Sequence, residues 1–76
     1  MNYDVKRETI YSDGTKSMYT TRYNVLGYAM CEYNAFITVF RKNKSYYCNE
    51  AFINDKCIFS AKKEDLEYKI TLEVVK

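Results

Sequence analysis

Apolar and polar side chains alternate along the C-terminal segment LEYKITLEVVK (66–76). In an extended chain, Tyr68, Ile70, Leu72 and Val74 would project from one side, and mainly charged or polar residues would project from the other. A period of two residues with one apolar side is typical of a strand that packs on a core. The pattern therefore predicts a β-strand.

A turn signal separates two β-prone runs near the N-terminus. The runs YDVKRETIY (3–11) and KSMYTTRY (16–23) are rich in Tyr and Thr, and they flank the tetrapeptide SDGT. Asp followed by Gly is a strong hairpin signal, because Gly14 can adopt a positive φ angle. The pattern predicts a β-hairpin, and we interpret Asp13 as a turn former rather than as a catalytic acid.

The segment NVLGYAMCEYN (24–34) fits two kinds of structure. Its apolar residues follow a helical spacing, and Asn24 is placed to cap the first turn. Gly27 counts against a helix, since it costs about 1 kcal/mol relative to Ala. An extended conformation would instead leave apolar residues on both sides. The segment is therefore either one short helix or a strand or irregular crossover.

The next segment, AFITVF (35–40), is apolar on both sides when it is drawn as a strand. A strand buried on both sides is central in its sheet and needs cover above and below. In a chain of 76 residues, one helix can cover one side. We therefore expect sheet closure, a second subunit or a bound partner to cover the other side.

The remaining chain reads as short strands joined by tight turns. The strands are YYCNEAFI (46–53) and CIFSA (57–61), with INDK between them and KKED after them. In an alternative reading, Ser60 caps a short helix. The sequence as a whole predicts one mainly β domain over 1–76. We expect an antiparallel sheet or meander of about five to six strands, with or without one short helix near 24–34 packed on it, and an α+β fold is the alternative.

Composition indicates a soluble globular domain, with 47% hydrophobic and 29% charged residues. The longest apolar run is far shorter than the roughly 20 residues that a membrane-spanning helix needs. The first eleven residues contain no apolar core of a signal peptide. We therefore expect the protein in the cytoplasm of its host cell, without a membrane partner.

Metal and cofactor chemistry is not indicated. The chain has three cysteines and no histidine, and Cys31, Cys48 and Cys57 are 17 and 9 residues apart. A zinc site usually uses four Cys or His ligands with one close pair. We predict no metal and no cofactor, and three reduced, partly buried thiols. A Cys48–Cys57 disulfide stays open as an alternative.

The sequence also lacks the usual catalytic groups. Without histidine there is no ordinary general base near neutral pH. The two glycines form no phosphate-binding motif. Cys31 is followed by Glu32, and a neighbouring acid raises the pKa of a thiol rather than lowering it. We predict that the protein is not an enzyme.

Positive charge gathers in the middle of the chain, where residues 34–63 carry six cations and two anions. The segment RKNKSYY (41–47) supplies the candidate contact residues, which are Arg41, Lys42, Lys44, Tyr46 and Tyr47. Cations and tyrosines could hold phosphates and stack on bases, dock on an acidic protein surface, or form a solvated turn. The sequence pI of about 8.4 is below that of most dedicated nucleic-acid binders. If 34–53 is a hairpin, the two adjacent tyrosines point to opposite faces.

Nine tyrosines among 76 residues are more than a thin core readily absorbs, and tyrosine is enriched at interfaces. Lys, Asn, Ile and Tyr together number 29, a bias typical of AT-rich genomes. This profile resembles the short accessory proteins of phages and mobile elements, including anti-CRISPR and other anti-defence inhibitors. We expect a binding protein that sterically blocks a host protein with an acidic or nucleic-acid-binding surface. The alternatives are a nucleic-acid-binding regulatory module and a homo-oligomeric structural protein.

Overall fold

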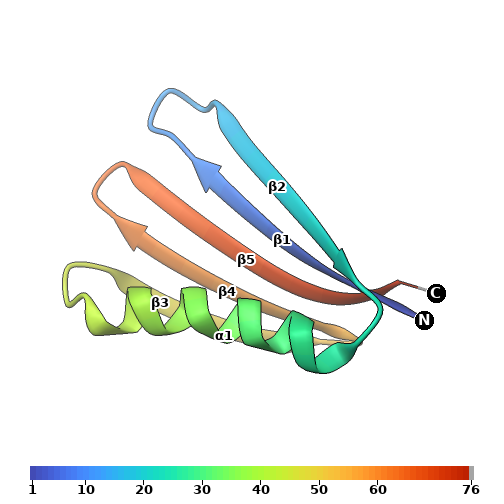
Figure 1. Cartoon of the computed structure of the whole chain (residues 1–76). Coiled ribbons are helices and arrows are strands. Elements are labelled where there is room, and N and C mark those ends of the chain that lie inside the picture. The colour runs from blue at the N-terminus through green and yellow to red at the C-terminus, as the bar shows by residue number, and fades with distance from the viewer. Residues whose placement is uncertain (76) are drawn as a thin grey trace.

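The computed structural model describes residues 1–75, and Lys76, the last residue of the predicted C-terminal strand, lies outside this range. A β-hairpin, a helix and a three-stranded meander follow one another along the described chain (Figure 1). The elements are β1 (Asn2–Ile10), β2 (Lys16–Tyr23), α1 (Leu26–Lys42), β3 (Tyr47–Ile53), β4 (Lys56–Lys63) and β5 (Leu66–Val75). The predicted mainly β class is confirmed.

The five strands form one antiparallel sheet with the order β2-β1-β5-β4-β3. The central strands β1 and β5 come from opposite ends of the chain and pair from Asn2 opposite Val75 to Ile10 opposite Glu67. Strands β2 and β3 form the two edges. The predicted hairpin, the two later turns and the C-terminal strand are confirmed. The alternative helix after Ser60 is wrong, because β4 continues to Lys63.

Helix α1 is longer than predicted and replaces the predicted central strand. It runs through residues 35–40, so AFITVF forms the C-terminal half of a helix. The stripe that packs on the sheet consists of Ala29, Tyr33, Phe36, Ile37 and Phe40. These positions lie three and four residues apart, the spacing of one helix face. Val39 is on another face and is 65% exposed, so the segment is not buried all round.

The two ends of α1 also differ from the prediction. Val25, and not Asn24, is the N-cap, and its side chain makes no capping hydrogen bond. At the other end, the backbone N–H of Asn43 donates to the carbonyl of Phe40 at 3.2 Å.

Within residues 1–75, no helix is long and apolar enough to cross a lipid bilayer.

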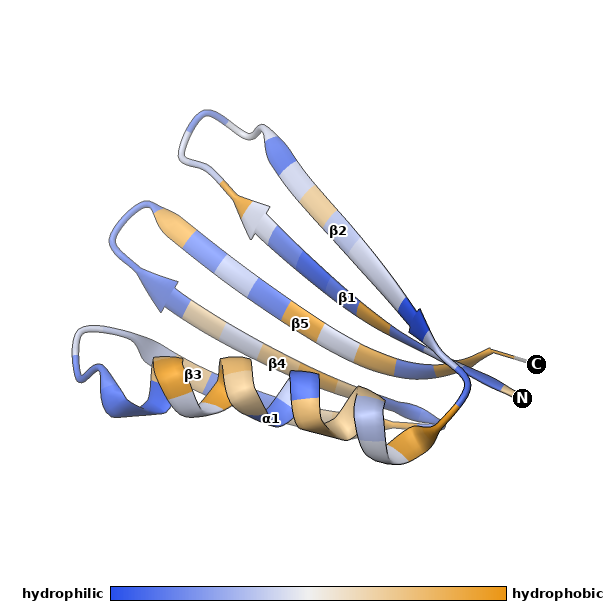
Figure 2. Cartoon of the chain, viewed as in Figure 1, coloured by the Kyte–Doolittle hydropathy of each residue, from blue (hydrophilic) through white to orange (hydrophobic). Residues whose placement is uncertain are grey.

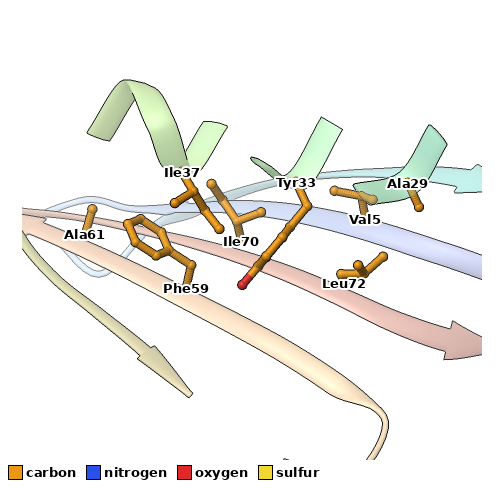
Figure 3. Packing of buried hydrophobic residues seen from close by; sticks show 8 residues of the cluster. All are labelled: Val5, Ala29, Tyr33, Ile37, Phe59, Ala61, Ile70 and Leu72. Carbon is orange, nitrogen blue, oxygen red and sulfur yellow. The ribbon is translucent and has the colours of Figure 1, made fainter. Parts of the chain in front are cut away.

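The core lies between α1 and the inner side of the sheet. Figure 3 shows its eight buried residues, which are Val5, Ala29, Tyr33, Ile37, Phe59, Ala61, Ile70 and Leu72. Phe59 and Val5 are the largest fully buried side chains, and burial of such side chains stabilises a fold by roughly 1.5–3 kcal/mol each. Figure 2 shows the matching alternation of hydrophobic and hydrophilic residues along β5. Ile70 and Leu72 lie on the inner side, as the period of two predicts.

The outer side of the sheet is largely polar, which corrects the expectation that it needs a cover. Arg22 on β2 binds Asp4 on β1 through two hydrogen bonds of 2.8 and 3.1 Å. The Arg22 hydrogen bond holds the pKa of Asp4 below its ordinary value. Lys6 and Lys56 both form ion pairs with Glu73 on β5. The expectation that a second side needs cover assumed a central strand at 35–40, but this segment is part of α1.

The three cysteines are free thiols. Cys31 is exposed on α1, contrary to the expectation of partial burial, whereas Cys48 and Cys57 are partly buried. In the register of β3 and β4, Cys57 lies opposite Phe52, which is four residues along β3 from Cys48. Four residues of a strand span about 13 Å, and a disulfide needs Cα atoms within about 7 Å. This register excludes the Cys48–Cys57 disulfide.

Candidate partner-binding site

The five predicted contact residues lie where α1 leads into β3. Arg41 and Lys42 are the last residues of the helix, Lys44 and Tyr46 lie in the loop, and Tyr47 begins the strand. The predicted hairpin over 34–53 is therefore a helix, a loop and a strand. The structure gathers the five residues at one corner of the molecule, but it gives two of them structural contacts.

Arg41 connects the helix to β3. Its Nη2 donates to Glu50 Oε1 at 2.8 Å, and its guanidinium carbon lies 5.6 Å from the centre of the Phe59 ring. The Tyr33 hydroxyl donates to the other oxygen of the same carboxylate, Glu50 Oε2, at 3.1 Å. Burial, and then this hydrogen bond to Glu50, raises the pKa of Tyr33 well above its usual range. Arg41 thus has a structural contact on the surface of the fold, and its side chain is still 56% exposed.

Tyr46 belongs to an aromatic cluster at the end of the core. Its ring centre lies 5.1 Å from that of Phe40 in an edge-to-face contact and 5.9 Å from that of Tyr68. Lys63 Nζ lies 5.5 Å from the same ring. Tyr47 is 81% exposed and so does not share this burial. The prediction that the two tyrosines point to opposite faces assumed a hairpin over 34–53, which is wrong; the two side chains differ because one is packed and the other is exposed.

Lys42, Lys44 and Tyr47 are the predicted contact residues that stay available. All three are exposed, and neither lysine takes part in an ion pair within residues 1–75. The two lysines lie next to the start of β3, where Tyr47 projects. This corner therefore offers two cations and one aromatic side chain to a partner.

Strand β3 is an edge without the usual protection. Its sequence, YCNEAFI, contains no lysine, arginine or proline, which are residues that discourage an exposed edge from pairing with another chain. Its charged residue, Glu50, is already paired with Arg41. Every residue of β3 has a partner on β4, so no bulge interrupts the strand. Near its end, Phe52 and Ile53 are 71% and 54% exposed.

The opposite edge, β2, is better protected. Lys16 and Arg22 place a cation near each end of the strand. β2 also has exposed apolar residues, since Met18 and Tyr19 are 56% and 65% exposed. The difference between the edges is therefore charge, and β3 is the edge more open to an added strand.

The thiol of Cys57, on the strand next to β3, is not activated. Burial, followed by the charge of Glu50, raises the pKa of the Cys57 thiol, which lowers the fraction of reactive thiolate. Within the described part of the chain, no three His, Cys, Asp or Glu side chains are grouped so that they could hold a metal ion.

Phe52 and Ile53 are not among the contact residues that the sequence predicts. Their strand is predicted, but its edge position follows from the sheet order and not from a local pattern. A usable signal was present, because 47–53 is free of lysine, arginine and proline although the loop before it is basic.

No protein-family model, curated protein or solved structure matches this chain. Its function is therefore inferred from its own surface.

Proposed function

We propose that this protein is a small non-enzymatic binding protein, which captures an extended segment of a partner protein on the free edge of β3. The main support is the absence of protective residues and bulges along this seven-residue strand. An edge strand exposes backbone N–H and C=O groups that an added strand can pair with. Backbone pairing would supply affinity, and the side chains along the edge would supply specificity.

Tyr47 and Phe52 are the expected anchors of this contact. They lie near opposite ends of β3 and, by strand alternation, project from opposite sides of the sheet. Both are largely exposed in the free protein. Large aromatic side chains often supply most of the binding energy of an interface. A partner strand would therefore be held on both sides of the sheet.

The charge around β3 favours an acidic partner. Lys42 and Lys44 lie beside its start, and Lys62 on β4 lies opposite Tyr47. Complementary charge raises the association rate and selects among partners more than it adds affinity. We therefore expect Asp or Glu residues in the captured segment.

Steric blocking of a host protein is the role that we propose for this capture. The compositional resemblance to accessory proteins of phages and mobile elements supports an anti-defence or anti-CRISPR-like inhibitor. Nucleic-acid binding is the second candidate, supported by the exposed Lys42, Lys44 and Tyr47. It is the weaker candidate, because Tyr46 is packed in the aromatic cluster and leaves one ring at this corner for stacking.

A nuclease-treated pull-down with matched variants tests the proposal. Tagged wild-type protein, the double variant Tyr47→Ala/Phe52→Ala and the control Tyr28→Ala are compared. Tyr28 on α1 is 64% exposed and lies outside the β3 edge. We expect the double variant to bind the captured protein at least about tenfold more weakly, since hot-spot side chains contribute about 2 kcal/mol or more. The control should retain wild-type affinity.

Hydrogen exchange then locates the contact. Strand addition predicts slower exchange of β3 backbone amides in the purified complex, with β2 amides unchanged. Equal binding by wild type and double variant, or no protection of β3, would contradict the proposal. Binding lost on nuclease treatment and falling steeply with salt would favour the nucleic-acid alternative. A dimer in light scattering, with β3 protected, would instead identify a second copy as the occupant.

A further inference from the structure

Arg7 is a cation on the side of the sheet that faces the helix. In the strand register it lies between Tyr19 on β2 and Ile70 on β5. Its guanidinium carbon is 4.5 Å from the ring centre of Phe36 on α1 and 5.6 Å from that of Tyr19. Val5, two residues earlier on the same side of β1, is fully buried. The guanidinium is therefore held among aromatic rings next to the core.

Arg7 has no anionic partner in the described part of the chain. Its Nε atom is buried without a hydrogen-bond acceptor. Glu8 lies opposite Lys69 in the register and, by alternation, projects from the other side of the sheet. Glu32 on α1 accepts a hydrogen bond from Tyr23 at 2.8 Å through Oε1, and its Oε2 is also buried without a partner. Burying part of a cation without an anionic partner is costly, and an anion beside Arg7 would reduce that cost.

A pocket of about 210 Å³ lies beside this guanidinium. The side chains on the helix-facing side that also line it are mainly aromatic or apolar, and they are Thr9, Tyr19, Phe36, Phe40, Tyr68 and Ile70. Glu8 and Lys69 line it too, but by strand alternation their side chains project from the other side of the sheet. An engineered cavity of about 150 Å³ holds benzene, whereas pockets for drug-sized ligands are about 300–1,000 Å³. The space therefore suits one ring with a small substituent and is too small for a nucleotide.

We propose that this pocket binds a free monocarboxylic acid with a single ring, of about the size of benzoate. The carboxylate would accept two hydrogen bonds from the terminal nitrogens of Arg7, since Nε itself is buried, and such paired contacts are typical of guanidinium with carboxylate. The ring would lie against Phe36 and Phe40. The pocket is lined by β1, β2, α1 and β5, and β3 is at the opposite edge of the sheet. Acid binding and capture at β3 are therefore separable.

Titration of the isotope-labelled protein with benzoate, followed by NMR, tests the proposal. We expect saturable shifts of the Arg7 Nε–H signal and of backbone signals around the pocket. Benzamide has a similar shape without the charge, and it should bind wild-type protein about ten to a hundredfold more weakly, the range expected for hydrogen bonds to a charged group. Arg7→Met should lose affinity to the same extent. The control Lys16→Met removes an exposed cation from β2 and should bind benzoate like wild type.

The benzamide comparison uses wild-type protein, so it decides the matter even if Arg7→Met does not fold. Equal binding of benzoate and benzamide, or no shift of pocket signals, would overturn the proposal. Glu32→Gln tests whether Glu32 neutralises Arg7 in solution. Benzoate binding that appears only in this variant would show an internal ion pair and would also overturn it. If Glu32→Gln binds benzoate as tightly as wild-type protein or more tightly, the proposal is supported.

Discussion

Replacing Tyr33 by phenylalanine removes the hydroxyl that joins the middle of α1 to strand β3. The ring would keep its place, because Tyr33 is only 4% exposed and packs in the core. The lost interaction is the 3.1 Å hydrogen bond to Glu50, whose carboxylate also accepts from Arg41 at 2.8 Å. The substitution therefore tests whether this three-residue network holds the helix against the edge strand.

The expected cost is about 1–1.5 kcal/mol. A hydrogen bond to a charged group contributes roughly 1.5–3 kcal/mol, but two features reduce this value. The distance is long for a hydroxyl donor, and the Glu50 side chain is 24% exposed, so water can replace the hydroxyl in part. A chain of 76 residues has a total stability of about 4–11 kcal/mol, so the loss would be substantial. It corresponds to a fall in Tm of about 4–12 °C.

Urea unfolding followed by circular dichroism measures the effect. Tyr33→Phe should lower the midpoint and leave the slope unchanged, since the surface exposed on unfolding is the same. Glu50→Gln and the double variant complete a cycle, which should give a coupling energy of about 1 kcal/mol between the two side chains. A neutral or stabilising Tyr33→Phe, or additive effects of the two changes, would refute the proposed network.

Three further predictions concern pH, backbone strain and the helix cap. Because the pKa of Tyr33 is raised in the folded state, stability should be complete below about pH 10 and fall above it, where the unfolded chain releases this proton. Urea midpoints from pH 8 to 11 should show a smaller fall in Tyr33→Phe, and equal falls would contradict the assignment. Gly14→Ala should destabilise by about 1–2 kcal/mol because φ is +89°, whereas Glu64→Asn should stabilise by about 0.5–1 kcal/mol because φ is +50° and Asn tolerates this region. Thermal unfolding checks both signs, and two changes of the same sign would count against backbone strain as the cause. Val25→Ser should add the missing cap and about 1 kcal/mol, and a lower Tm would show that the exposed Val25 has another role.

Local patterns predicted the strands well because each had an internal signal. The Asp13-Gly14 pair marked the first hairpin, and the alternation around Ile70 and Leu72 marked β5. The predicted helix was too short because AFITVF resembles a buried strand. The period through Ala29, Tyr33 and residues 36–40 does continue without a break, but five apolar residues among the six of AFITVF hide it. Only packing distinguishes the buried positions from the exposed Val39.

The candidate surface combines residues that the sequence singled out with residues that it did not. Charge and aromatic content directed attention to 41–47, which is next to the exposed edge. The sequence could not show that Tyr46 packs on Phe40 or that Arg41 pairs with Glu50, because these partners meet only after α1 and the sheet assemble. The exposure of Phe52 likewise depends on sheet order, since the same strand in a central position would be covered.

The pairing of the two chain ends at the centre of the sheet has a consequence for how the molecule is made. The β1–β2 hairpin and the β3–β4–β5 meander contain local contacts and can form early, but β1 meets β5 only when both ends of the described chain are present. Contacts between distant segments slow folding, and synthesis at about 5–20 residues per second leaves β1 waiting for β5 for several seconds. During that time one side of β1 is an open edge that another nascent chain could occupy. Yield on expression should therefore depend on crowding of nascent chains more than the stability of the finished fold would suggest.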